Sequence, residues 1–146
     1  MSDSIRLFNS LGKKKEVFYT NKKKEVSMYV CGPTVYDLLH IVNFRGPIFF
    51  NFLRNFLENK GYKVTYVYNY TDIDDKIINR SKEDNISTYE LSEKYINEFE
   101  KDYASLKIKK PSFTPKCTDH IDDIIDFIKD LIKKGRSEEH TSELQS

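Results

Sequence analysis

Apolar and polar residues alternate or repeat at helical spacing along the first half of the chain. Residues 25–30 alternate and run into a Gly-Pro pair, which predicts a strand that ends in a turn. Residues 46–61 place Pro47 at a first helical position and Gly61 just past the end, which predicts a helix. Residues 62–70 alternate again and are rich in β-branched and aromatic side chains, which predicts a second strand. The helical stripe comprises Phe49, Phe52, Leu53, Phe56 and Leu57.

This order of strand, helix and strand is the unit of a parallel sheet, because a crossover helix returns the chain to the same edge. The sequence therefore predicts an α/β fold with a parallel sheet. Ligands of such sheets bind beyond the carboxyl ends of the strands. These ends are residues 31–32 for the first strand and 69–71 for the second, so the two segments should lie close together.

The rest of the chain has the spacing of three helices, at residues 71–81, 87–106 and 118–135. In the second of them, Ser87 and Glu90 have the spacing of a capping box. The expected caps are Thr71 or Asp72, Ser87 and Thr118. The second helix repeats Leu91, Tyr95, Phe99 and Tyr103 on one face, and the third repeats Ile121, Ile124, Ile125, Ile128, Leu131 and Ile132.

Composition limits the class of protein. The 146 residues include 38% hydrophobic ones, which suits one globular domain. Two cysteines without a CxxC pair do not make a disulfide framework, and the N-terminus lacks the apolar run of a signal peptide. No apolar stretch approaches the ~20 residues that cross a bilayer. We expect a soluble protein of the reducing cytoplasm with no membrane contact.

The formal net charge of +1 includes two lysine runs, 13–15 and 22–24. Such runs could contact nucleic-acid phosphate. Because lysine is abundant throughout the chain, however, solvated surface is the favoured interpretation of both runs.

Residues 136–146, with the sequence RSEEHTSELQS, abandon the composition of the preceding chain. They resemble the in-frame translation of a sequencing-adapter oligonucleotide, so we expect residues 1–135 to be the native part and 136–146 a non-native tail. A genomic reading frame that encodes these residues would contradict this.

The segment CGPTVYDLLHIVN, residues 31–43, holds the candidate chemistry. His40 and Asn43 stand after a strand end and near a helix N-terminus, where backbone N–H groups favour phosphate. Taken alone, His40 fits a structural role at least as well. Gly32 permits close backbone approach. Taken alone, Cys31 fits a small buried hydrophobe at a strand end better than a zinc ligand. A zinc site needs three or four ligands, which this chain does not supply by spacing.

Three acidic residues, Asp72, Asp74 and Asp75, follow the second strand. Paired carboxylates can hold Mg²⁺. Their position in a first helical turn, where carboxylates stabilise the helix dipole, favours the structural interpretation. There is no P-loop and no nucleophilic triad that the sequence alone can place.

Three collinear blocks, residues 28–46, 61–81 and 115–135, resemble the N-terminal half of the catalytic domain of the cysteinyl-tRNA synthetases. The resemblance covers nearly all of residues 5–135. It implies a class I synthetase with a Rossmann-type, HUP-like fold that activates cysteine with ATP and transfers it to tRNA-Cys. It implies Zn²⁺ and ATP with Mg²⁺, and a monomer.

The resemblance also implies roles for individual residues. Cys31 matches one of four zinc ligands that take the substrate's thiolate, and His40 with Asn43 matches the signature that contacts ATP and the α-phosphate. The implied lining of the amino-acid and nucleotide pocket comprises Gly32, Thr34, His40, Asn43, Asn69 and Thr71. Zinc–thiolate bonding separates cysteine from serine better than an apolar pocket would.

The chain departs from the family pattern in two ways. Val42 stands where the signature has glycine, and its β-branched side chain would intrude on adenine. The other zinc ligands, a lysine-rich phosphate loop and an anticodon-binding domain do not occur in this sequence. We therefore expect a truncated and inactive part of a cysteine–tRNA ligase. The alternatives are a ligase that joins cysteine to an amino sugar, and a non-catalytic binding paralogue.

Overall fold

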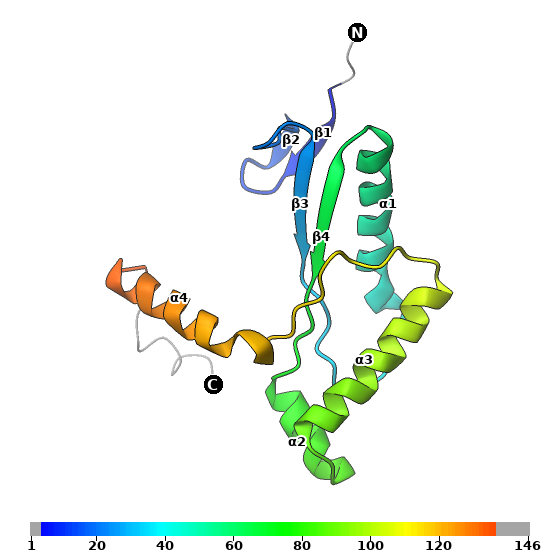
Figure 1. Cartoon of the computed structure of the whole chain (residues 1–146), viewed down its shortest axis with the longest axis vertical. Coiled ribbons are helices and arrows are strands. Elements are labelled where there is room, and N and C mark those ends of the chain that lie inside the picture. The colour runs from blue at the N-terminus through cyan, green and yellow to red at the C-terminus, as the bar shows by residue number, and fades with distance from the viewer. Residues whose placement is uncertain (1–3, 137–146) are drawn as a thin grey trace.

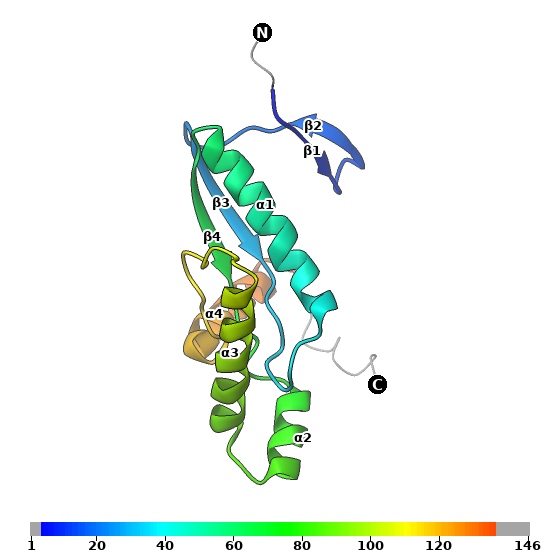
Figure 2. The same ribbon diagram turned by 90° about the vertical axis from the view of Figure 1, so that its right-hand side faces the viewer.

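A parallel pair of strands forms the centre of the chain, whose residues 4–136 are described by a computed structural model. β3 lies beside β4, with Glu25 opposite Lys63 and Val30 opposite Tyr68. The connection between them contains α1, which packs along β4 (Figures 1 and 2). This confirms the predicted α/β class. The strands are β1 Arg6–Asn9, β2 Lys14–Val17, β3 Glu25–Val30 and β4 Lys63–Tyr68; the helices are η1 Ile41–Phe44, α1 Arg45–Asn59, α2 Asp75–Asp84, α3 Thr88–Ser105, η2 Thr118–His120 and α4 Ile121–Lys133.

An extended segment, residues 112–117, runs parallel to β4 on the side away from β3. The N–H of Tyr68 donates to the carbonyl of Phe113 at 3.0 Å, and the N–H of Tyr70 donates to Pro115 at 2.9 Å. The sequence pattern predicted only a break between helices here, because two prolines and no alternation mask the extended backbone. Three adjacent segments therefore end at the same edge of the sheet.

Aromatic side chains fill the main core. Phe99 of α3 stacks on Phe44 with ring centroids 5.3 Å apart and on Tyr68 with centroids 5.9 Å apart. Burial raises the pKa of Tyr68 to about 12. The predicted face of α3 is confirmed, because Leu91, Tyr95, Phe99 and Tyr103 are all buried. Phe44 ends η1, so α3 also fixes the position of the segment that precedes α1.

The N-terminal cap predicted for α3 is present in the structure, whereas the one predicted for α4 is not. Ser87 Oγ accepts from the Glu90 N–H at 3.1 Å, and Glu90 Oε2 accepts from the Ser87 N–H at 2.9 Å, which confirms the capping box. The prediction of Thr118 as a helix cap is wrong, because Thr118 begins the short η2 turn and α4 starts only at Ile121. Gly135, just past α4, has a φ of 62° as a helix-ending glycine requires.

The apolar stripes predicted on two helices are largely exposed to solvent. On α1, Leu57 is buried against the sheet, but Phe49, Phe52 and Phe56 are exposed. Pro47 is the third residue of α1, because the helix already begins at Arg45. On α4, four isoleucines of the predicted stripe are also exposed, whereas Leu131 and Ile132 are half-buried. A helical period therefore identifies an apolar face correctly without showing that anything within residues 4–136 covers it.

None of the helices among residues 4–136 has the length and apolar character needed to cross a membrane. The expected non-native tail falls outside the described residues, apart from Arg136.

Candidate active site

The carboxyl ends of β3 and β4 are held together by Asn69. Its Oδ1 accepts a hydrogen bond from the backbone N–H of Gly32 at 2.9 Å. A Cβ atom on Gly32 would lie 1.6 Å from the carbonyl oxygen of Asn69, so only glycine permits this approach. The predicted convergence of the two strand ends is confirmed, and Gly32 is required for it.

Backbone pairing continues beyond the two strands. The N–H of Thr71 donates to Pro33 at 3.0 Å, and the N–H of Val35 donates to Thr71 at 3.2 Å, so Thr34 lies opposite Thr71. Asn69 Nδ2 lies 3.5 Å from Thr71 Oγ1. The structure thus brings together four of the predicted pocket residues, namely Gly32, Thr34, Asn69 and Thr71.

Both thiols of the chain lie near this corner. Cys31 is exposed at the end of β3, and Cys117 is half-buried at the end of the extended segment. Asn69 Nδ2 is 3.9 Å from Cys117 Sγ. Partial desolvation, with smaller contributions from the two cysteines, raises the pKa of the Tyr29 phenol. Tyr29 and Cys117 line the same cavity beside the corner.

A cavity of about 300 Å³ opens next to the corner. Cys117 and Asn69 line it from the sheet, and His120 and Ile124 line it from η2 and α4. Sequence reasoning did not assign Cys117 or His120 to the site, because their place depends on the unpredicted segment 112–117. His120 Nδ1 lies 2.9 Å from Asp123 Oδ2, which orients its ring.

His40 and Asn43 form a second group at the start of η1. Asn43 Oδ1 accepts from the His40 backbone N–H at 2.9 Å, and the Asn43 N–H donates to the His40 carbonyl at 2.9 Å. Both side chains are exposed. No hydrogen bond within residues 4–136 joins this pair to the strand-end residues. The buried residues Val35 and Phe44 instead hold the two groups in one aromatic core.

Val42 lies between His40 and Asn43, and its side chain is 75% exposed. Val42 does not belong to the core, and its side chain lies on the solvent side of η1.

The acidic residues after β4 separate into two roles. Asp74 caps α2 by accepting from the Lys76 N–H at 2.8 Å, so the prediction of Thr71 or Asp72 as the cap is wrong. Asp75 lies in the first turn of α2, where its negative charge interacts favourably with the helix dipole and stabilises the helix. Asp72 is buried instead.

Asp72 connects the site to α4. Its Oδ1 accepts from the Thr118 N–H at 3.0 Å, and its Oδ2 accepts from the Thr118 hydroxyl. Nearby, Lys116 pairs with Glu93 of α3, and that hydrogen bond raises the pKa of the lysine. These two contacts fix residues 116–118 and thereby the Cys117 side of the cavity. Neither had a signal in the sequence, since both join residues more than 20 positions apart.

Within residues 4–136, no cluster of three or more His, Cys, Asp or Glu side chains could hold a metal ion. An exposed thiol such as Cys31 fits one position of a zinc site, and the soft sulfur suits that metal. Residues 4–136 therefore do not by themselves bring together the three or four ligands that a zinc site needs.

The amino-acid sequence was compared with protein families and with known proteins. Residues 17–144 match the family described as tRNA synthetases class I (C) catalytic domain. A cysteine–tRNA ligase of Bdellovibrio bacteriovorus is 50% identical over 135 residues, which cover 92% of this chain and 28% of the relative. One from Staphylococcus aureus strain MSSA476 is 49% identical over 131 residues, with 90% and 28% covered. The chain therefore spans about 28% of the length of these relatives, and it belongs to the family of class I (C) tRNA synthetase catalytic domains.

Proposed function

We propose that this chain is the N-terminal part of a cysteine–tRNA ligase, which activates cysteine with ATP and transfers it to tRNA-Cys. The observation that carries the proposal is the exposed Cys31 thiol at a strand end, where Gly32, Asn69 and Thr71 converge. The family match places this corner in a synthetase catalytic domain. The chain by itself is expected to be inactive, because it offers one zinc ligand and part of the nucleotide site.

The proposed role of Cys31 is to hold Zn²⁺ together with ligands from elsewhere in the full-length protein. Bound zinc would take the thiolate of the substrate cysteine and reject the hydroxyl of serine. Asn69 fixes the backbone beside Cys31 through Gly32, so the thiol is presented in a defined direction. Thr34 and Thr71, opposite one another, would line the rest of the amino-acid pocket.

The proposed role of His40 and Asn43 is to bind ATP, with Mg²⁺, and to stabilise charge on its α-phosphate. In adenylation the carboxylate of the substrate cysteine attacks the α-phosphorus of ATP in line. The low pKa of that carboxyl group means that it is already ionised at neutral pH. The residues therefore contribute position and hydrogen bonds rather than a general base. Asn43 holds the His40 backbone at 2.9 Å, so the pair acts as one rigid unit.

The compartment and assembly follow the same proposal. Both cysteines are free thiols, as the reducing cytoplasm maintains them, and we propose a cytoplasmic monomer. Light scattering of the full-length protein at micromolar concentration tests the assembly, and a dimer mass would contradict it.

The test of function uses the full-length protein in two assays. Cysteine-dependent ATP–pyrophosphate exchange measures activation, and esterification of a tRNA-Cys transcript measures transfer. The proposal predicts both, with serine unreactive in each. Exchange without esterification, together with cysteine transfer to a glucosamine-type acceptor, would favour the amino-sugar ligase. Absence of exchange in a zinc-loaded protein would favour the non-catalytic paralogue.

A further inference from the structure

Charged residues are segregated along the chain. The first 24 residues contain seven Lys or Arg and two Asp or Glu, whereas the remaining 122 contain 17 and 21. The net charge of +1 is therefore the sum of +5 at one end and −4 over the rest. A general abundance of lysine would spread positive charge evenly, so it does not explain this separation.

The fold gathers the positive segment into one anchored hairpin. β1 and β2 pair only with each other, at the end of the molecule opposite α2 (Figures 1 and 2). The Phe18 N–H donates to Ile5 at 2.8 Å, and the Phe18 ring lies 6.2 Å from that of Tyr62. Lys24 Nζ donates to the Lys60 carbonyl at 2.8 Å, which caps the end of α1. These contacts hold the hairpin in a fixed orientation, with Lys24 in a structural role.

One face of the hairpin combines basic side chains with an aromatic ring. Phe8 lies directly opposite Lys15, and Arg6 is two residues away on the same face. The Arg6 guanidinium donates to the Lys15 carbonyl at 3.1 Å, which holds it beside its neighbour. Phe8 is 63% exposed. On this face the ring therefore has one cation next to it along its own strand and one across from it on the paired strand.

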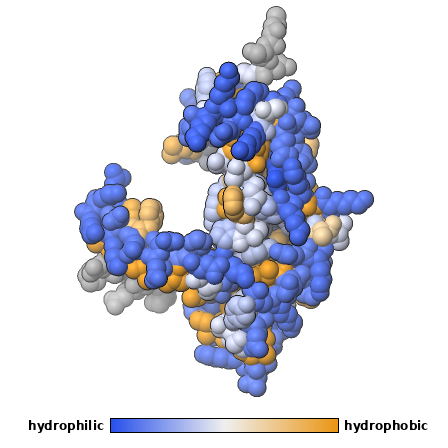
Figure 3. Space-filling model, in the orientation of Figure 1, coloured by the Kyte–Doolittle hydropathy of each residue, from blue (hydrophilic) through white to orange (hydrophobic). Residues whose placement is uncertain are grey.

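A second aromatic ring stands just after the hairpin. Tyr19 is 83% exposed, and it is followed by Lys22 and Lys23, both exposed. Tyr19 and Lys22 line a cavity of about 340 Å³ between the hairpin and β3, to which Glu25 adds one acidic side chain. Figure 3 shows hydrophilic residues covering this end of the molecule, with few apolar ones among them.

We propose that this basic–aromatic surface, formed by Arg6, Phe8, Lys15, Tyr19, Lys22 and Lys23, binds RNA. Lysine and arginine neutralise backbone phosphates, and exposed aromatic rings stack on unpaired bases. The assignment of that RNA as the tRNA substrate rests on the proposed function. An anionic membrane would be drawn by the same charge, and the test includes it.

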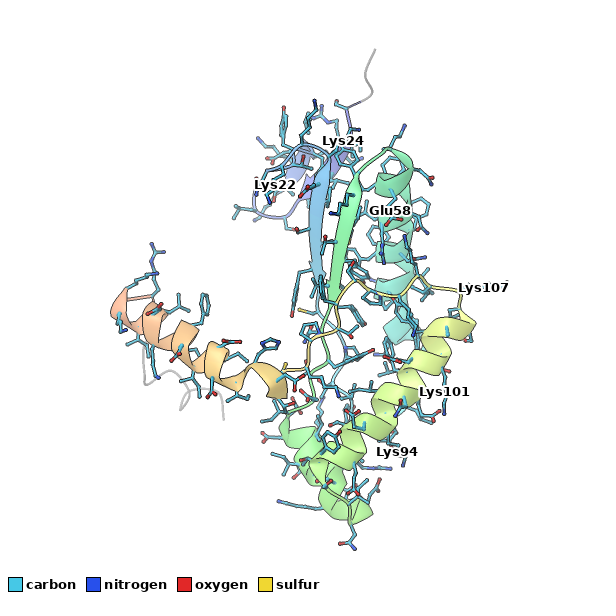
Figure 4. The ribbon with its side chains drawn as sticks, in the orientation of Figure 1. Lys22, Lys24, Glu58, Lys94, Lys101 and Lys107 are labelled. Carbon is cyan, nitrogen blue, oxygen red and sulfur yellow. The ribbon has the colours of Figure 1, made fainter. Side chains whose placement is uncertain are left out.

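Salt-dependent binding tests the charge of this surface. The 146-residue chain is titrated into a fluorescein-labelled tRNA-Cys transcript at several KCl concentrations, and affinity is read by anisotropy. The variant K15Q/K22Q/K23Q should lower the slope of log affinity against log salt by about two to three, because each lost phosphate contact contributes ~0.7–0.9. The matched control K94Q/K101Q/K107Q removes three lysines from or near α3, far from the hairpin (Figure 4). Its slope should stay unchanged.

The contribution of the aromatic rings to RNA binding is tested with a second variant and a matched control. Tyr19→Ser should weaken RNA binding about tenfold without changing the salt slope, since stacking releases no counterions. Tyr89→Ser removes another highly exposed ring, 70% accessible on α3, and should leave RNA binding unchanged.

Three outcomes would overturn the inference. An equal loss of RNA affinity and of salt slope in the hairpin and α3 lysine variants would show that RNA binding does not depend on the hairpin. Binding to vesicles of phosphatidylserine and phosphatidylcholine without binding to RNA would assign the surface to a membrane. In the full-length protein, K15Q/K22Q/K23Q should raise the KM for tRNA and leave pyrophosphate exchange, which needs no tRNA, unchanged. An unchanged KM refutes the inference alone, whereas absence of exchange in the wild type refutes the proposed function alone.

Discussion

Gly32 shows how one residue sets the geometry of the corner. A side chain there would meet the backbone of Asn69 rather than a flexible side chain, so the two strand ends would have to separate. The Gly-Pro pair was readable in the sequence as a turn. The reason for the glycine was not, because the atom it avoids belongs to a residue 37 positions away.

We predict opposite effects from the same substitution at two glycines. Gly32→Ala should destabilise the chain by roughly 3 kcal/mol, because it forces backbone apart in a packed site. Gly46→Ala should stabilise it by about 0.5–1 kcal/mol, since Gly46 is helical and a Cβ there meets nothing within 4 Å. Urea unfolding followed by circular dichroism measures both. A neutral Gly32→Ala variant would mean that the strand ends are not held as described.

The resemblance to the cysteinyl-tRNA synthetases implies a glycine at the position of Val42. We predict that Val42→Gly in the full-length protein strengthens ATP binding, because it removes an exposed β-branched side chain from the turn that we propose as part of the ATP site. Equilibrium dialysis with labelled ATP measures the affinity. The same affinity in both proteins would mean that the corner has adapted around the valine.

At the scale of elements, pattern-based prediction succeeded where neighbouring residues decide the outcome. The capping box of α3, the alternation of β3 and β4 and the glycine after α4 all depend on residues within four positions. It failed at η2, where a distant carboxylate, Asp72, holds the Thr118 hydroxyl that the local pattern assigned to a helix cap. It also missed the segment 112–117, whose pairing is long-range.

The end of α1 is tied to the segment after α3 by a small network of charges. Arg54 is buried and donates to the Lys110 carbonyl at 2.7 Å and to Glu58 at 3.1 Å. Glu58 also accepts from Lys109 at 2.8 Å, and this hydrogen bond is the main cause that lowers the pKa of Glu58. The network holds the start of the extended segment against α1.

We predict that Glu58→Gln lowers the free energy of unfolding by about 1 kcal/mol at pH 7. A carboxylate whose pKa is lower in the folded state stabilises above its unfolded pKa, near 4.5, and loses that contribution as the pH falls. The difference between wild type and variant should therefore shrink below pH 4.5. Glu98→Gln, which breaks an exposed pair with Lys101, should change little at any pH. A pH-independent effect of Glu58→Gln would contradict the assigned cause.

At the scale of the whole molecule, several apolar faces lie open within residues 4–136. Phe49, Phe52 and Phe56 of α1 and four isoleucines of α4 are exposed, and the relatives that match this chain are more than three times as long. Amphipathic periodicity could predict these faces from sequence. What covers them could not be predicted, because a period carries no information about the partner.

We predict that the 146-residue chain retains no stoichiometric zinc after dialysis. Cys31 offers one ligand, and residues 4–136 contain no cluster that would complete a site. Inductively coupled plasma mass spectrometry of the dialysed chain measures the metal. Tight one-to-one zinc would show that Cys31 has ligands that the structure does not bring near it.

We propose that the full-length protein activates cysteine at the corner formed around Cys31. Cysteine-dependent ATP–pyrophosphate exchange, measured in the full-length protein and in its Cys31→Ser variant, tests it most directly. We expect robust exchange in the wild type and a loss of at least about a hundredfold in the variant, because the variant would lack a proposed zinc ligand. Exchange that survives Cys31→Ser at the wild-type rate would contradict it.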